Sequence, residues 1–174
     1  DTRVEASLEN FTLNLRGAVN ATISTASATA TIIDNEAAAP AAPIAIAGTA
    51  GNDILQGTQF ADAMTGAAGN DTFNGGEGND SMAGGGGNDI YLVENAGDTY
   101  TEAAGAGNDL VISYLAAHTL GANVERLQLA GTATTGTGNS LNNTITGNTR
   151  NNTLNGGTGS DTLDGATGSD TISG

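Results

Sequence analysis

Aspartate recurs every nine residues in the middle of this chain, and carboxylates at a fixed spacing are candidates for metal binding. Five consecutive nine-residue units cover residues 48–92, and each begins with glycine. The sixth place of these units is always aspartate: Asp53, Asp62, Asp71, Asp80 and Asp89. The eighth place is always a large apolar residue: Leu55, Met64, Phe73, Met82 and Tyr91. A second block of the same period covers residues 138–174, with these sixth places: Asn143, Asn152, Asp161 and Asp170.

The order of residues within each unit predicts a turn followed by a short strand. Glycine in the first six places permits positive φ angles and close approach of backbones. The last three places predict a strand whose eighth-place side chain points inward. Two units then complete one flattened coil, and turns on the same side stack at the inter-strand spacing of roughly 4.8 Å. The predicted fold class is all-β, a parallel β-roll or β-solenoid of nonapeptide repeats.

Stacking of these turns places the aspartates in two columns. We expect Asp53, Asp71 and Asp89 in one column, with Asp62 and Asp80 in the other. Neighbouring carboxylates at this spacing repel by roughly 3 to 4 kcal/mol at an effective dielectric constant near 20. A cation between each pair would convert this repulsion into attraction. The pairs Asp53/Asp71 and Asp71/Asp89 are the first sites expected.

Calcium is the cation that these ligands favour. Carboxylate and carbonyl oxygens on flexible turns suit Ca²⁺ rather than Zn²⁺ or Cu²⁺. The carbonyls expected to join the carboxylates belong to the fourth-place glycines: Gly51, Gly69, Gly78 and Gly87. The alternative is a disordered linker, which low hydrophobicity and high charge favour. We expect that state without calcium, whereas an apolar eighth place kept in phase indicates folding with calcium.

Two departures from the pattern predict weaker sites. Phe60 replaces a fourth-place glycine, and we expect it to distort the turn before Asp62 and weaken the Asp62/Asp80 site. Asn143 and Asn152 are neutral, so the early second block is expected to stack through amide hydrogen bonds with little or no calcium. Asp161 and Asp170 lie in units that follow the repeat pattern, and they remain candidate ligands.

Units such as GAAGNDTFN (66–74) and GGGGNDIYL (84–92) resemble those of RTX (repeats-in-toxin) proteins. The segment 93–137 is similar to the spacer repeats of large RTX surface proteins. Asp98 follows Asp80 by two full periods, whereas Asp109 follows Asp89 by two periods and two further residues. We therefore expect the solenoid to continue through the spacer, with both aspartates as candidate ligands and two residues bulging between Asp89 and Asp109. Its strands are predicted at 99–102, 110–114 and 125–129.

The resemblance to RTX proteins also implies a location and a folding route. It implies type I secretion to the extracellular space or the bacterial cell surface, and folding on meeting extracellular calcium. Weak sites, with dissociation constants on the order of 10⁻⁴ to 10⁻³ M, are typical of extracellular modules.

The N-terminal region is predicted to be separate from the repeats. Residues 1–36 contain VEASLENFTLNL (4–15) and TATIIDNE (29–36), which look like the final part of a Calx-β domain, an Ig-like sandwich, here as a β-hairpin. That resemblance offers four candidate calcium ligands: Glu5, Glu9, Asp34 and Glu36. The simpler interpretation is that these side chains are solvated charges at the ends of strands. Residues 37–47 contain both prolines and are predicted to be a linker.

Composition excludes several classes of function. A formal net charge of −15 opposes binding to nucleic acid or to anionic membranes. The chain has no cysteine, and it has no apolar run near the length of a membrane span. The single histidine, His118, has no nucleophile or acid beside it in the sequence, and a surface or strand-edge role is expected for it. We therefore expect no enzymatic activity.

Three functions remain compatible with the sequence. The first is a calcium-binding structural or adhesive segment of a large secreted or cell-surface RTX protein. The second is the C-terminal folding and secretion module of an exported hydrolase. The third is a subunit of a self-assembling filament or lattice, because open solenoid ends present unpaired strand edges. The expected partners are calcium ions and either other copies of the chain or cell-surface and matrix components.

Overall fold

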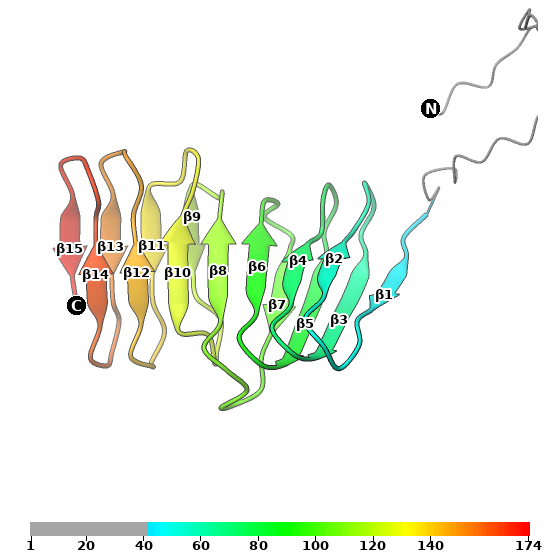
Figure 1. Ribbon diagram of the computed structural model, residues 1–174. Helices are drawn as coiled ribbons and strands as arrows, with labels where there is room; N and C mark the ends of the chain where they lie inside the picture. The colour runs from blue at the N-terminus through cyan, green and yellow to red at the C-terminus, as the bar shows by residue number, and fades with distance from the viewer. Residues whose placement is uncertain (1–41) are drawn as a thin grey trace, which may run out of the picture. The chain divides into compact units, whose positions relative to one another are not determined.

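Residues 42–174 are the part of the chain described by the structure, a computed structural model. They form a parallel β-solenoid whose consecutive strands alternate between two faces of a flattened coil (Figure 1). The predicted fold class is therefore confirmed. The predicted Calx-β hairpin at 1–36, with its four candidate ligands, lies outside the described residues. Residues 42–174 include no helix long and apolar enough to cross a membrane.

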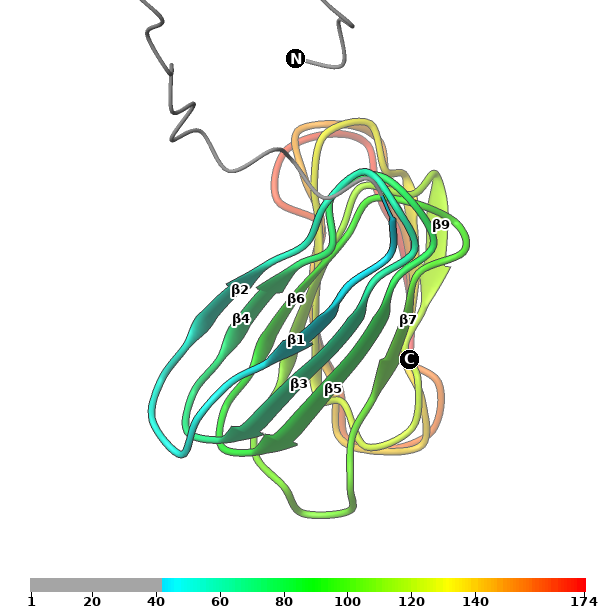
Figure 2. The same ribbon diagram turned by 90° about the vertical axis from the view of Figure 1, so that its right-hand side faces the viewer.

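One face of the solenoid is a single sheet of seven strands, and the other face is divided into two sheets of four. The seven-stranded sheet contains β2 (Ile54–Gln56), β4 (Thr72–Asn74), β6 (Ile90–Val93), β8 (Leu110–Ser113), β10 (Arg126–Leu129), β12 (Thr144–Thr146) and β14 (Thr162–Asp164). The first four-stranded sheet contains β1 (Ala45–Ala47), β3 (Ala63–Ala68), β5 (Ser81–Gly86) and β7 (Thr99–Thr101). The second contains β9 (Ala117–Thr119), β11 (Thr135–Thr137), β13 (Thr153–Asn155) and β15 (Thr171–Ser173). Figure 2 shows β2, β4 and β6 in one layer and β1, β3 and β5 in the other.

The register of the strands follows the nine-residue period, with two exceptions. Paired strands are regularly two periods apart, as in the pair Leu55 and Phe73. Ile90 pairs with Leu110, which lies two residues beyond that spacing. Leu110 in turn pairs with Arg126, which falls two residues short of it. The long coil and the short coil together equal two regular ones, so the period is restored at β10.

The two extra residues lie in the loop between β7 and β8, which projects beyond the neighbouring turns in Figure 1. This agrees with the predicted bulge between Asp89 and Asp109. The compensating short coil between β8 and β10 was not predicted. The spacer strands β7, β8 and β10 lie within one residue of the expected ranges.

The interior is filled mainly by eighth-place side chains, joined in the spacer by five further buried residues: Val93, Leu120, Val124, Leu129 and Ala133. Phe73 and Tyr91 are fully buried and their rings stack at a centroid distance of 5.0 Å. Tyr91 contacts Tyr100 at 5.4 Å, and Tyr100 stacks on His118 at 5.8 Å. A continuous aromatic row therefore runs through the middle of the solenoid, although the sequence has few aromatic residues.

The expectation of a surface role for His118 is wrong. His118 is on β9, the edge strand of its sheet, but its side chain is only 8% exposed. It takes the eighth-place position, faces inward and pairs with Gly136 of β11. Its Nε2 lies 2.9 Å from the Tyr100 hydroxyl. Burial lowers the pKa of His118, which favours the neutral ring.

The predicted linker at 37–47 extends too far. β1 occupies residues 45–47 and pairs with β3, so the solenoid begins before the first complete unit. Ile46 pairs with Met64 and packs against the core. Ile46 precedes Leu55 by one full period, so it already holds an eighth place. The linker prediction missed this because the surrounding residues are mostly alanine and proline.

Candidate metal centre

The aspartates of the first column each lie directly before a strand of the seven-stranded sheet. The Asp53 N–H donates a hydrogen bond of 2.8 Å to Asp71 Oδ1, and the Asp71 N–H donates one of 2.7 Å to Asp89 Oδ1. The Asp89 N–H donates in the same way to Asp109 Oδ1 at 2.8 Å. Asp71, Asp89 and Asp109 thus each bind the backbone of the preceding coil through one of their two oxygens.

The second column stands on the opposite side of the coil. The Asp62 N–H donates to Asp80 Oδ1 at 2.8 Å, and the Asp80 N–H donates to Asp98 Oδ1 at 3.1 Å. Phe60 does not break this ladder, because its N–H donates to Thr58 Oγ1 at 3.1 Å. The hydrogen bond between the two coils therefore keeps its ordinary length, and it does not show the distortion expected before Asp62.

The second oxygen of four sixth-place carboxylates has no hydrogen-bond partner. These four oxygens are buried, and each of the four side chains is at most 1% exposed: Asp71, Asp80, Asp89 and Asp109. An ionised oxygen that is buried without a donor is strongly unfavourable. A bound cation or a proton would satisfy it. This observation fits a metal that takes oxygen ligands, as calcium does.

A backbone carbonyl oxygen lies near at least one of these unpartnered carboxylate oxygens. A Cβ atom placed on Gly66 would lie 2.2 Å from Asp71 Oδ2 and 2.6 Å from the Gly84 carbonyl oxygen. The carboxylate and the carbonyl of the next coil therefore approach the same spot, which only a glycine leaves open. Such a spot lined by two oxygens is suited to a cation.

The fourth-place carbonyls that the sequence suggested as ligands face the next turn of the same column. A Cβ on Gly69 would lie 2.6 Å from the Gly51 oxygen, and one on Gly87 would lie 2.0 Å from the Gly69 oxygen. The Gly87 oxygen lies in the same way against Gly107. Gly78 lies above the Phe60 carbonyl. These carbonyls are therefore placed between stacked turns.

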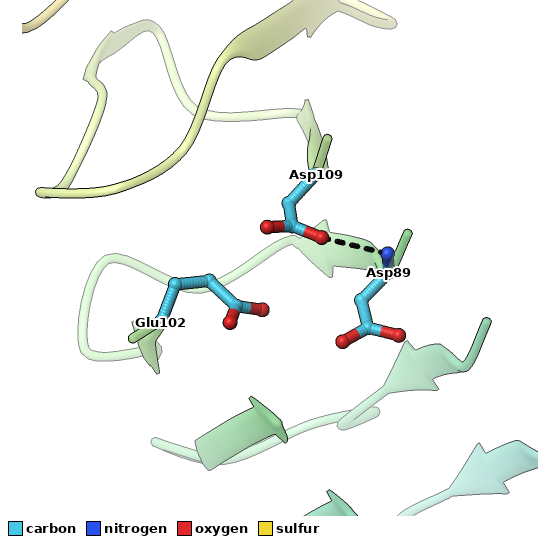
Figure 3. Close-up of side chains that lie close together, drawn as sticks. All are labelled: Asp89, Glu102 and Asp109. Carbon is cyan, nitrogen blue, oxygen red and sulfur yellow. Dashed lines mark hydrogen bonds between the residues drawn. The ribbon is translucent and has the colours of Figure 1, made fainter. Parts of the chain in front are cut away.

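Three carboxylates come together where the coil is longest (Figure 3). One oxygen from each of Asp89, Glu102 and Asp109 lies within 4.8 Å of the other two. Glu102 belongs to the loop between β7 and β8 that carries the two extra residues. Its Oε1 accepts a hydrogen bond from the Tyr91 hydroxyl, and its Oε2 is buried without a partner.

The protonation of this cluster is strongly perturbed. Burial raises the pKa of Glu102 to about 7; the Tyr91 hydrogen bond opposes this rise, and the charges of Asp109 and Asp89 add to it. Burial also raises the pKa of Asp109 to about 6, with a contribution from the Asp89 charge. The pKa of Asp89 is raised chiefly by burial. Three negative charges are therefore stable here only with a cation or with bound protons.

In three other predicted ligands the second oxygen, Oδ2, has a hydrogen-bond donor. Asp53 Oδ2 accepts from the Thr49 N–H at 2.6 Å. Asp62 Oδ2 accepts from the Thr58 N–H at 2.6 Å. Asp98 Oδ2 accepts from the backbone of Glu94 at 3.1 Å and of Asn95 at 2.9 Å. The structure thus brings all of the predicted aspartates into columns but gives these three less need of a cation.

The second block stacks partly through amides, as expected for a neutral sixth place. Asn143 Nδ2 donates to the carbonyls of Val124 at 3.2 Å and Glu125 at 3.3 Å. The N–H of Asn143 donates to Asp161 Oδ1, and that of Asn152 donates to Asp170 Oδ1, both at 2.8 Å. Asp161 and Asp170 are partly exposed.

Sequence reasoning missed Glu102 and Glu125. Glu125 stands in the first column, where its Oε2 accepts the Asp109 N–H at 3.0 Å. It falls two residues short of two full periods after Asp109, so a search at the repeat spacing does not find it. Glu102 lies outside any nine-residue unit. Only the lengths of the irregular coils reveal these two residues.

Comparison with known proteins supports this geometry. The family model of the RTX calcium-binding nonapeptide repeat matches the chain in four copies, over residues 46–59, 56–91 and 137–172. Comparison with curated proteins and with solved structures gave no match. The matched segments contain both aspartate columns up to Asp89, together with Asp161 and Asp170.

Proposed function

This chain carries the calcium-binding repeats of RTX proteins, and we propose that it is a structural segment of a larger secreted or cell-surface protein, held rigid by calcium. In this proposal, calcium is bound between stacked turns, and the segment acts as a spacer or adhesive scaffold. Its ligands are the sixth-place carboxylates, with the carbonyls of glycine-rich turns completing the sites.

The observation that carries the proposal is the set of unpartnered oxygens on Asp71, Asp80, Asp89 and Asp109. In the folded state these carboxylates are close to one another and shielded from water. Calcium supplies the positive charge that the protein itself lacks here, because Arg126 and Arg150 are the only arginines in residues 42–174 and there is no lysine. Calcium binding would therefore contribute directly to the free energy of folding.

A scaffold role is supported by how the interior is used. The buried polar side chains of residues 42–174 are the sixth-place groups, Ser113 and His118. His118 is paired with the Tyr100 hydroxyl. The Ser113 Oγ accepts the Leu115 N–H at 3.3 Å. These groups complete the stacking of coils, which is the role expected of a spacer.

An extracellular location follows from the proposed calcium affinity. A fold whose sites are weak, as in extracellular modules, would form only where calcium is abundant. Together with the secretion typical of RTX proteins, this supports export of an unfolded chain and folding outside the cell.

The direct test is a calcium titration of the whole chain followed by circular dichroism, with magnesium as the control ion. We expect β-structure to increase with calcium and not with magnesium. Asp89→Asn should raise the calcium concentration at the midpoint of folding by roughly tenfold, because one buried ligand charge is lost. Glu77→Gln makes the same change of charge on an exposed side chain and should leave the midpoint unchanged. Equal β-structure with and without calcium would contradict the proposal.

A further inference from the structure

The nonapeptide turns of this chain belong to two structural classes that differ at place two. In one class place two is threonine or asparagine, in the turns that begin at residues 48, 57, 138 and 147. The N–H of this residue donates to the side-chain oxygen of place six, as Thr58 does to Asp62 at 2.6 Å and Asn148 does to Asn152 at 2.8 Å. We call these capped turns.

The side chain at place two holds the capped turn in this conformation. Thr58 Oγ1 accepts the place-four N–H of Phe60 at 3.1 Å, and Asn148 Oδ1 accepts that of Arg150 at 2.9 Å. The same two contacts occur in the remaining capped turns, through Thr49 and Asn139. A residue without a side-chain oxygen could not accept the place-four N–H.

In the other class place two is glycine or alanine with positive φ. These open turns contain Ala67 (83°), Gly76 (88°), Gly85 (103°), Gly157 (92°) and Ala166 (62°). In three of them the place-two N–H points to the side chain two residues earlier. Gly76, Gly157 and Ala166 donate in this way to Asn74, Asn155 and Asp164. The place-six carboxylate thereby loses its donor.

Asp62 and Asp80 show the consequence within one column. Both are buried, and the two are joined by the hydrogen bond between their coils. Burial alone would raise the pKa of Asp62, but the N–H groups of Ile44 and Thr58 and the Thr58 hydroxyl lower it below the ordinary value. In the open turn, burial and the nearby charges of Asp98 and Asp62 raise the pKa of Asp80. Asp80 Oδ2 has no partner.

We propose that place two determines which turns need calcium. This inference rests on the proposed function and refines it. Capped turns satisfy their place-six group from their own backbone and keep their shape without the ion. Every open turn leaves an oxygen of its place-six carboxylate for the ion to bind. This oxygen is buried in the turns at 66–71, 75–80 and 84–89, whereas Asp161 and Asp170 of the last two open turns are partly exposed to water. The calcium requirement is therefore concentrated in 66–109, whereas the coil at 138–155 is built from two capped turns with neutral place-six amides.

Hydrogen–deuterium exchange of the whole chain, with and without calcium, tests this division. Removal of calcium should abolish protection of amides in 66–109 and leave most of the protection in 138–155. No effect of calcium on any turn would contradict the proposed function itself. Equal loss of protection in both segments would overturn this inference alone.

A pair of variants at one capped turn gives a second test. Thr58→Gly removes the oxygen that accepts the Phe60 N–H, so the turn should become calcium-dependent, and the calcium midpoint of folding should rise by roughly twofold or more. Thr58→Ser keeps that oxygen and should behave as the unmodified chain. If the two variants have the same midpoint and the same exchange, place two does not set the requirement. The exchange result on the unmodified chain decides the question even if Thr58→Gly does not fold.

Discussion

The backbone N–H of Asp89 donates to Oδ1 of Asp109 at 2.8 Å, although the two residues are two positions further apart than the regular spacing of the column. The carboxylate ladder is thus continuous across the irregular coil. The loop between β7 and β8 absorbs the two extra residues, and it brings Glu102 to the place where the two aspartates meet. The irregularity therefore adds a third carboxylate to the column without interrupting it.

Glu102→Gln tests this three-carboxylate cluster. Loss of one negative charge should stabilise the calcium-free fold, because the repulsion from Asp89 and Asp109 is relieved. The same change should raise the calcium midpoint of folding several-fold, because a ligand charge is lost. Thermal unfolding followed by circular dichroism with and without calcium measures both effects. Glu94→Gln, at an exposed position, is the control. Equal behaviour of the two variants would exclude Glu102 from the site.

The pH dependence of folding should have opposite signs with and without calcium. Without calcium, the pKa values of about 7 for Glu102 and about 6 for Asp109 lie above their ordinary values of 4.5 and 3.8. The folded state then holds more protons than the unfolded state, so this stabilisation is present at low pH and lost as pH rises through 6 to 7. The calcium-free chain should be more folded at pH 5 than at pH 8.

With calcium bound, the carboxylates are held ionised and their pKa values fall. Stability should then increase with pH over the same interval, because protons compete with the ion. Circular dichroism of protein stripped of calcium, and of protein in excess calcium, at pH 5 and pH 8 measures both slopes. Slopes of the same sign in the two conditions would contradict the assignment of these groups.

Gly66→Ala tests the spot where oxygens converge. Its Cβ would lie 2.2 Å from Asp71 Oδ2 and 2.6 Å from the Gly84 carbonyl, so calcium binding at this turn should be weakened or lost. Gly86→Ala is the matched control, because a Cβ there meets nothing within 4 Å and its φ is not positive. Calorimetric titration with calcium should show fewer or weaker sites for Gly66→Ala only. Equal binding by both variants would show that this spot is not used.

Phe73→Ala tests the interior stack in excess calcium. Phe73 is fully buried against Tyr91, so its truncation should reduce the free energy of unfolding by about 3–5 kcal/mol. Ile54 on the neighbouring strand β2 is 85% exposed, and Ile54→Ala should change the free energy of unfolding by less than about 0.5 kcal/mol. Urea unfolding measures both. A small effect of Phe73→Ala would mean that calcium, rather than the apolar row, supplies nearly all of the stability.

The regular part of this molecule was predictable from its sequence because one spacing determines several features together. A period of nine with glycine, aspartate and an apolar residue in fixed phase specifies the turn, the strand and the column. It predicted the stacking of Asp53 on Asp71 and of Asp71 on Asp89, and the hydrogen bonds between their coils agree.

The remaining features depend on departures from the period. Glu102 and Glu125 join the column only because one coil is two residues longer and the next is two shorter. His118 is buried because its strand holds an eighth place opposite Gly136. The difference between Asp62 and Asp80 arises at place two of their turns, through the direction of a backbone N–H. Such a direction follows from local φ angles, which the repeat pattern alone did not specify.

The most direct measurement is a crystal structure of the chain grown in calcium, with anomalous scattering used to locate the ions. We predict anomalous peaks beside the unpartnered oxygens of Asp71, Asp80, Asp89 and Asp109, and none beside Asn143 or Asn152. A folded solenoid with no peak along these columns, and with the four carboxylates turned into solvent, would contradict the account.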